Sequence, residues 1–155
     1  MPSIALYQPD IPQNAGTILR LCACLDVEAH VIEPAGFDLS DRALRRAGMD
    51  YLALVRLIRH LSWSDFEAWR AKSGRRLILL TTRATLPYAS FAFGPEDIIL
   101  LGRESAGVPT AVHDAAAERL VIHMAAGLRS INVATAAAMV LGEALRQTRG
   151  FPVPV

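Results

Sequence analysis

Lysine is almost missing from this 155-residue chain: of its 16 basic residues, 15 are arginine and only Lys72 is lysine. The formal net charge is only +1, so no overall positive field indicates a nucleic-acid-binding protein. Arginine is suited to planar, bidentate recognition of phosphate. A high-GC coding bias would favour the same composition, however, so the arginine content alone does not indicate a function.

Cysteine and long apolar runs are also scarce. Cys22 and Cys24 are two residues apart and would not share a helix face, so we expect neither a disulfide nor paired metal ligation, as suits a reducing cytoplasm. The N-terminal segment lacks the basic and apolar stretches of a signal peptide. The longest apolar-rich run, 131–145, is interrupted by Asn132 and Glu143 and is too short to span a bilayer. We expect a soluble, cytoplasmic protein without membrane contact.

Several common catalytic signatures are absent from the sequence. Gly102 and Gly107 have the glycine spacing of a P-loop, but no Lys-Ser/Thr pair follows, and no G-x-G-x-x-G follows the first expected strand. We find no nucleophile elbow and no Ser/His/Asp or Cys/His arrangement. The histidines lack metal-ligand spacing, so neither a metal nor a covalent nucleophile is predicted. The four histidines are His30, His60, His113 and His123.

Apolar residues make up 52% of the chain and charged residues 20%, which predicts one globular domain with a sizeable core. Runs of apolar residues alternate with helical patterns, and this alternation predicts an α/β domain with a mainly parallel sheet covered on both faces. The expected strands are 3–8, 29–33, 52–58, 76–82, 97–101 and 119–123. The first expected helix opens at Gln13 with Asn14 as its cap. Two more span 41–47 and 63–72, the second capped by Ser62 or Ser64. The last helix runs to Gln147, with Ser130 as a possible cap.

Three polar segments follow expected strands, at 9–20, 102–109 and 124–132. In a parallel α/β sheet, ligands bind outside the carboxyl ends of the strands, so we expect these segments to converge on one site. Each segment taken alone has a structural interpretation. The 102–109 loop could be a tight turn with Glu104 as a capping acid, Arg20 could be a solvated helix residue, and Ser130 to Asn132 could simply cap the last helix.

Taken in order, the three segments resemble the motifs of a known family. They read IALYQPDIPQNAGTILRLCA, LLGRESAGVP and RSINVATAAAMV, and HVIEPAGF and RRAGMDY add to the likeness. The chain resembles the SPOUT class of RNA methyltransferases, and in particular its small YibK/TrmL-like tRNA ribose 2′-O-methyltransferases. It departs from that pattern at Leu101, His123, Ala134-Thr135 and Gly142.

The resemblance implies a single domain over residues 1–155 with a C-terminal trefoil knot at about 76–147, which binds S-adenosylmethionine without a metal. Ordinary connection rules would not predict a knot. The implied cofactor pocket comprises Leu80, Thr81, Gly102, Glu104, Gly107, Ile122, Met124, Ser130 and Asn132. The implied catalytic residues are Asn14, Arg20, Glu104, Ser130 and Asn132. The implied RNA contacts are Arg20, Arg42, Arg45, Arg46, Arg103 and Arg129.

The resemblance further implies a homodimer that methylates the wobble nucleotide, cytidine or uridine 34, in the anticodon loop of leucine tRNAs. The dimer interface would use the helix of the first motif and the last helix. Two alternatives stay open: another tRNA or ribosomal RNA target, and a non-catalytic RNA-binding or assembly protein that keeps the knot. The Arg42, Arg45 and Arg46 cluster could equally be a solvated helix face.

Overall fold

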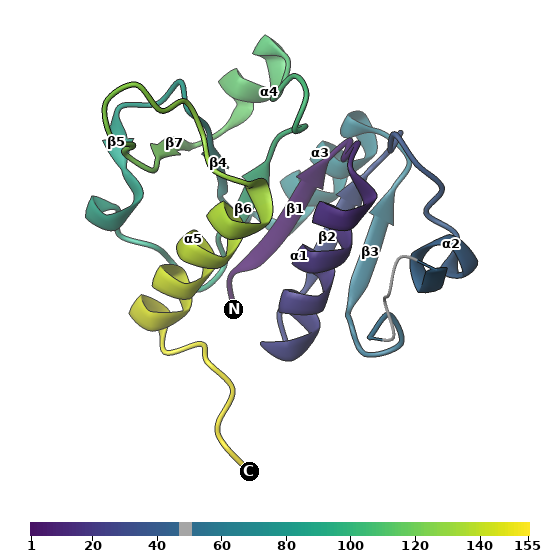
Figure 1. Cartoon of the computed structure of the whole chain (residues 1–155). Coiled ribbons are helices and arrows are strands. Elements are labelled where there is room, and N and C mark those ends of the chain that lie inside the picture. The colour runs from purple at the N-terminus through teal and green to yellow at the C-terminus, as the bar shows by residue number, and fades with distance from the viewer. Residues whose placement is uncertain (47–50) are drawn as a thin grey trace.

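The computed structural model describes residues 1–46 and 51–155 of the chain. Strands and helices alternate along most of it (Figure 1). The strands are β1 (Ser3–Tyr7), β2 (Ala29–Ile32), β3 (Leu57–His60), β4 (Leu77–Leu80), β5 (Leu86–Pro87), β6 (Ile98–Leu101) and β7 (Glu118–Val121). The helices are α1 (Pro12–Cys24), α2 (Asp41–Arg46), α3 (Trp63–Ser73), the 3-10 turn η1 (Tyr88–Ser90), α4 (Thr110–Ala115) and α5 (Val133–Thr148).

The strands of the described residues form one seven-stranded sheet in the order β3-β2-β1-β6-β4-β7-β5. Each neighbouring pair is parallel, as in β1 with β6, where Ser3 is opposite Ile98 and Leu6 opposite Leu101. Strands β1, β2 and β6 are buried along their whole length, which is typical of a parallel sheet covered on both faces. The predicted α/β class is therefore confirmed.

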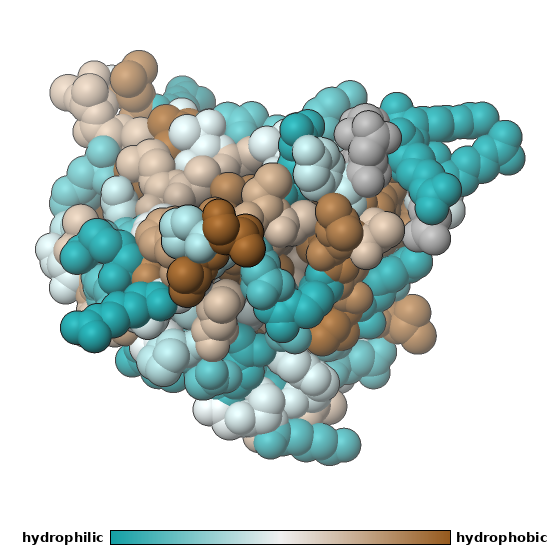
Figure 2. Space-filling model, turned by 90° about the horizontal axis from the view of Figure 1, so that it is seen from below, coloured by the Kyte–Doolittle hydropathy of each residue, from teal (hydrophilic) through white to brown (hydrophobic). Residues whose placement is uncertain are grey.

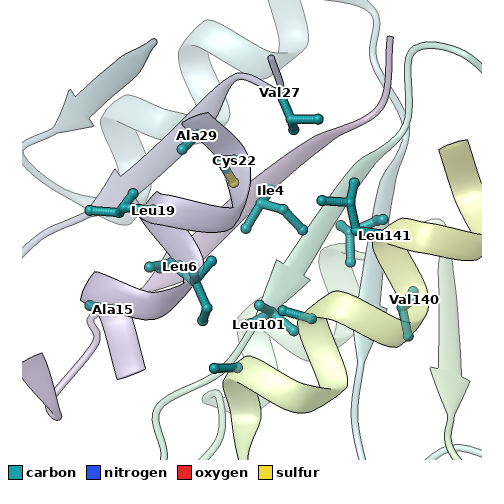
Figure 3. Close-up of a cluster of buried hydrophobic side chains, with 14 of the residues drawn as sticks. Ile4, Leu6, Ala15, Leu19, Cys22, Val27, Ala29, Leu101, Val140 and Leu141 are labelled. Carbon is teal, nitrogen blue, oxygen red and sulfur yellow. The ribbon is translucent and has the colours of Figure 1, made fainter. Parts of the chain in front are cut away.

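Side chains that alternate along each strand feed two separate cores, one on each face of the sheet. In β1, Ile4 and Leu6 point toward α1 and α5, whereas Ala5 and Tyr7 belong to the core on the opposite face. Helices α1 and α5 lie side by side on the first face, and Figure 3 shows residues of both helices closing over the strands. Helix α3 covers the other face through Phe66, which is fully buried.

The strand predicted at 52–58 is wrong. Residues 51–54 form a turn in which the Leu54 amide donates to the Tyr51 carbonyl oxygen at 2.9 Å. The strand in this region is β3, and it pairs with β2 from Ala29 opposite Leu57 to Ile32 opposite His60. The apolar run 52–58 looks like a buried strand, but Leu54 is 69% exposed. The pairing with β2, which the run itself does not encode, sets where the strand begins.

One predicted helix start is corrected and another is confirmed. Helix α1 begins at Pro12, with Ile11 as its N-cap, so Asn14 lies within the first turn instead of capping the helix. Proline suits the first helical position because the missing N–H would be unpaired there anyway. Ser62 is the cap of α3 and accepts from the Asp65 amide at 3.0 Å. The predicted extension of the 41–47 helix to Ala47, and part of the RRAGMDY stretch, lie outside the described residues.

The two ends of the chain lie on the same side of the molecule, beyond the amino ends of the central strands (Figure 1). Seen from that side, strongly hydrophobic residues gather near the middle of the face, with hydrophilic side chains around them (Figure 2). The chain end itself carries exposed apolar side chains, with Phe151 48% and Val153 87% exposed. No helix of the described residues is long and apolar enough to cross a membrane.

Candidate active site

The loops after β6, β4 and β7 meet at the carboxyl edge of the sheet and enclose a cavity of about 350 Å³. These three strands are neighbours in the sheet although they are far apart in the sequence. The cavity brings together all nine residues that the family resemblance implied for a cofactor pocket. They are Leu80, Thr81, Gly102, Glu104, Gly107, Ile122, Met124, Ser130 and Asn132. The predicted convergence of the polar segments is therefore observed.

The pocket wall mixes apolar surface with a few polar groups. Leu101, Ile122 and Val133 contribute aliphatic surface, while Thr81 and Ser130 contribute hydroxyl groups. A concave site of this size, mostly apolar with a few convergent polar groups, suits a ligand the size of a nucleoside derivative.

The loop after β6 folds back on itself at two glycines. Arg103 and Gly107 form an antiparallel bridge, with the Arg103 amide donating to the Gly107 oxygen at 2.9 Å and the Gly107 amide donating back at 2.8 Å. A Cβ atom at Gly102 would lie only 2.8 Å from the Gly107 carbonyl carbon. Gly107 itself has φ +63°, a left-handed conformation that favours glycine. The tight turn that the sequence offered as a structural interpretation is therefore present, and the same loop lines the pocket.

The last segment is held by Asn132, which caps α5 in place of the predicted Ser130. Its side-chain oxygen accepts from the Ala134 amide at 2.8 Å and the Thr135 amide at 3.3 Å. Its side-chain nitrogen donates to Asn14 Oδ1 at 2.9 Å. One amide side chain therefore starts α5 and joins it to the first turn of α1. Ser130 is exposed, lies in the pocket wall and is not used for capping.

Glu104 sits in the pocket wall next to a residue that sequence reasoning did not select, Asp10. The Glu104 amide donates to Asp10 Oδ1 at 3.2 Å, and the Asp10 amide donates to Glu104 Oε2 at 3.3 Å. Burial raises the pKa of Glu104, whereas the hydrogen bond with the Glu104 side chain, followed by that with Ser105, lowers the pKa of Asp10 to about 2. The sequence signal that could have singled out Asp10 is its place between Pro9 and Pro12, because the two prolines restrict the backbone of this loop.

The arginines implied for RNA binding do not gather in one place within the chain. Arg103 lines the pocket, and its Nε lies 3.7 Å from Asp10 Oδ2. Arg20 is exposed on α1 outside the pocket wall, with its guanidinium 4.6 Å from the centre of the Tyr51 ring, a cation–π distance. Arg129 is exposed next to the pocket residue Ser130.

The three remaining arginines, Arg42, Arg45 and Arg46, are exposed on α2. This helix lies beyond β3, toward the opposite edge of the sheet from the pocket loops (Figure 1). The cluster therefore does not contribute to the pocket of its own chain. A partner that contacted both would have to reach across the molecule.

A parallel α/β sheet with a pocket at its carboxyl edge, lined by the loops after three neighbouring strands, is typical of ligand-binding α/β domains. Comparison with known proteins makes the class specific. The chain belongs to the SpoU rRNA Methylase family, whose model matches residues 1–142. It is therefore a methyltransferase, and the SPOUT resemblance drawn from the three motifs is confirmed.

Relatives of known name and structure agree with this assignment. A protein of Beijerinckia indica named tRNA (cytidine(34)-2'-O)-methyltransferase is 66% identical over 144 residues, which cover 93% of this chain and 90% of the relative. A solved structure described as giving insights into the 2-OH methylation of C/U34 on tRNA matches with a TM-score of 0.88 and 38% identity over 95% of both chains. AviRb from Streptomyces viridochromogenes, in complex with AdoMet, matches with a TM-score of 0.83 and 26% identity over 95% of this chain and 60% of its own.

Proposed function

We propose that this protein transfers a methyl group from S-adenosylmethionine to the ribose 2′-hydroxyl of the wobble nucleotide, cytidine or uridine 34, of leucine tRNAs. The observation that carries the proposal is the 66% identity to a tRNA (cytidine(34)-2'-O)-methyltransferase over 93% of the chain. The protein would work in the cytoplasm as a homodimer, with the anticodon loop of tRNA as its partner. The leucine tRNAs, the homodimer and the cytoplasmic location are the parts of the proposal that rest on the family resemblance alone.

The pocket suits S-adenosylmethionine by its size and by one unpaired polar group. Its volume of about 350 Å³ suits a nucleoside carrying a short side chain. A buried Arg103 Nε lacks a hydrogen-bond partner among the described residues, and such a group favours a bound acceptor nearby. A Cβ at Gly102 would collide with Gly107, so glycine at this position lets the loop keep the tight shape that lines the pocket.

Residues of all three loops would hold the cofactor, which supplies an activated methyl group on a sulfonium. Leu80, Ile122 and Met124 offer apolar surface, and Glu104 and Ser130 offer polar groups. The reaction needs a methyl acceptor held in line and one proton removed, so positioning supplies most of the rate enhancement. Asn14 and Asn132, which are hydrogen-bonded to each other in the pocket wall, would fix the edge of the site nearest to α1.

Arg20 would act as an electrostatic partner. Arginine side chains offer five N–H donors and no acceptor, so this group is suited to donating hydrogen bonds and not to acting as an ordinary base. It would stabilise the developing 2′-alkoxide or the neighbouring phosphate, while the proton leaves to phosphate or water. Lysine at this position keeps the charge but loses the planar, bidentate donor pair. We expect Arg20→Lys to lower kcat by about tenfold or more, on the order of a lost charge-assisted hydrogen bond. Full turnover by this variant, with unchanged RNA affinity, would refute the role.

We also propose that residues 1–155 form one domain and that residues of about 76–147 are knotted. The support is topological: β4 lies between β6 and β7 in the sheet, and the segment after β7 lies against the loops of both other strands in one pocket. A chain that passes between those loops before α5 begins would need this arrangement.

The decisive experiment is methylation of bulk tRNA from cells that lack the endogenous enzyme, followed by mapping of the modified nucleotide. Methylation at position 34 of leucine tRNAs supports the whole proposal. The family description names ribosomal RNA, so ribosomal RNA should be assayed in parallel as the second candidate substrate. Cofactor binding without methylation of either RNA would favour a non-catalytic RNA-binding protein.

A further inference from the structure

Asp10 lies in the short loop between β1 and α1, and its side chain is 14% exposed. Its carboxylate accepts from the Glu104 amide at 3.2 Å and from the Ser105 hydroxyl, and its own amide donates to Glu104 Oε2 at 3.3 Å. The bonded residues are separated by 94 and 95 positions in the sequence. They form a reciprocal clasp between the loop that begins α1 and the loop that forms one wall of the pocket.

The clasp is supported from behind. The Gly36 amide donates to the Pro9 carbonyl oxygen at 2.8 Å, and a Cβ at Gly36 would lie 2.9 Å from both Cα and Cβ of Asp10. Asp10 therefore cannot move away from the pocket loop without displacing the segment after β2. On the other side, the Arg103 guanidinium lies 3.7 Å from the Asp10 carboxylate, which adds an attractive charge.

The first turn of α1 is tied to a second pocket wall as well. Asn14 accepts a hydrogen bond from Asn132, the cap of α5, at 2.9 Å. The start of α1 thus contacts the loop after β6 through Asp10 and the segment after β7 through Asn14. Arg20 is six residues further along the same helix, and a regular helix moves as a rigid unit. A shift of the start of α1 would therefore carry Arg20 with it.

We propose that Asp10 is a positioning residue that couples occupation of the pocket by the cofactor to the placement of α1 and Arg20, so that bound cofactor strengthens RNA binding. The inference rests on the proposed function of the pocket and of Arg20. Coupling of this kind is reciprocal, so bound RNA strengthens cofactor binding by the same factor. At neutral pH the clasp keeps its charge, because the hydrogen bonds with Glu104 and Ser105 hold the pKa of Asp10 at about 2.

The test measures RNA affinity with and without saturating S-adenosylhomocysteine, which fills the pocket without turnover. A labelled anticodon stem-loop serves as the RNA, and calorimetry gives the affinity for S-adenosylhomocysteine. For the wild type we expect RNA to bind about tenfold more tightly when the pocket is filled, within the usual range of coupling between sites. Asp10→Ala should reduce this ratio to about one. Asp10→Asn retains an oxygen for the Glu104 amide and should restore most of it.

Two further variants separate coupling from folding. Ser62→Ala removes the cap of α3, so it should lower the melting temperature and leave the ratio unchanged. Ser105→Ala removes one exposed hydroxyl from the clasp and should lower the ratio partially even if Asp10→Ala does not fold.

A ratio of one in the wild type, an unreduced ratio in both Asp10→Ala and Ser105→Ala, or an equal loss of the ratio in Ser62→Ala would each overturn the inference. If the wild type bound neither S-adenosylhomocysteine nor RNA, the proposed function would fail together with it. The first three results, by contrast, would leave the proposed function standing.

Discussion

At the residue scale, the shape of the loop that lines the pocket depends on Gly102 having no side chain. A Cβ there would lie 2.8 Å from the Gly107 carbonyl carbon and 2.9 Å from its Cα, and both are backbone atoms that cannot rotate away. We expect Gly102→Ala to force the bridge between Arg103 and Gly107 open and to weaken S-adenosylhomocysteine binding by about tenfold or more, since close-packed sites resist even one extra methyl group. Isothermal calorimetry measures this change.

Gly94→Ala is the matched control. A Cβ at Gly94 would lie 3.5 Å from its nearest neighbours, in ordinary van der Waals contact, and Gly94 does not line the pocket. This variant should bind the cofactor analogue normally. Equal affinity in Gly102→Ala and the wild type would show that the glycine bridge does not shape the pocket.

Asn132 combines two roles that different substitutions can separate. Asn132→Asp keeps an oxygen for the Ala134 and Thr135 amides but removes the donor to Asn14. Asn132→Ala removes both and should cost about 1 kcal/mol of folding stability, as is usual for a lost N-cap. Urea unfolding should therefore rank the aspartate variant close to the wild type and the alanine variant below it.

A third variant checks the assignment of the cap. Because Ser130 does not cap α5, Ser130→Ala should leave the stability unchanged. If Ser130→Ala were as unstable as Asn132→Ala, Ser130 would be the cap after all.

At the scale of elements, α3 covers a buried polar network on the far face of the sheet. His30 Nδ1 lies 3.1 Å from His60 Nε2, and His30 Nε2 lies 3.0 Å from Glu28, which also pairs with Arg75 at 3.0 Å. Both histidine rings pack against Phe66 of α3. Burial lowers the pKa of His60. Burial also lowers the pKa of His30 from 6.5 to about 4, although the negative charge of Glu28 acts in the opposite direction.

These shifts predict a loss of stability in mild acid. The unfolded chain takes up a proton on His30 near pH 6.5, whereas the folded chain takes it up only near pH 4. The stabilisation is therefore complete above pH 6.5 and is lost as the pH falls toward 4, at up to about 1.4 kcal/mol per pH unit.

Urea unfolding at a series of pH values measures this slope. His30→Gln should be less stable at pH 7 and should show a shallower decline between pH 6.5 and 4, whereas the exposed His123→Gln should follow the wild type. Parallel curves for His30→Gln and the wild type would exclude His30 as the source.

Which elements were predictable from the sequence follows from what each depends on. The strands β1, β4 and β6 are apolar runs that lie next to one another in the middle of the sheet. Their positions could therefore be predicted from the runs of apolar residues in the sequence. The start of β3 depends on pairing with β2, and the turn at 51–54 within an apolar run was missed for that reason. Helix α4 and strand β5 were also missed, because six and two residues are too short to show a periodicity.

At the scale of the whole molecule, the convergence of the three polar segments was predictable because the carboxyl ends of parallel strands share one edge. The residues that these segments contact were less predictable. Asp10 contacts Glu104 across 94 residues, and no local pattern encodes such a pair. The sequence likewise predicted Ser130 as the cap of α5, whereas the cap is Asn132. The side chain of Asn132 also contacts Asn14, and only the assembled fold provides that contact.

The outer side of α5 makes the homodimer testable. Thr135, Met139 and Gly142 lie along one partly exposed stripe of the helix, and Met139 is 39% exposed. Small and apolar residues in such a stripe let a second copy approach closely, and a two-fold dimer would use the same surface twice. Met139→Lys places a charge in the stripe. The new lysine can pair with Glu143 one turn later, so we expect the stability of the folded monomer to be unchanged.

We expect the wild type to sediment as a dimer and Met139→Lys as a 16.8 kDa monomer. Leu61→Lys, a matched change at a 78% exposed leucine between β3 and α3, should remain dimeric. Arg20 is not part of the pocket wall of its own chain, so a site completed by the second copy should lose methylation in Met139→Lys far more than it loses cofactor affinity. A monomeric wild type, or a monomeric Met139→Lys with full methylation, would mean that each chain works alone.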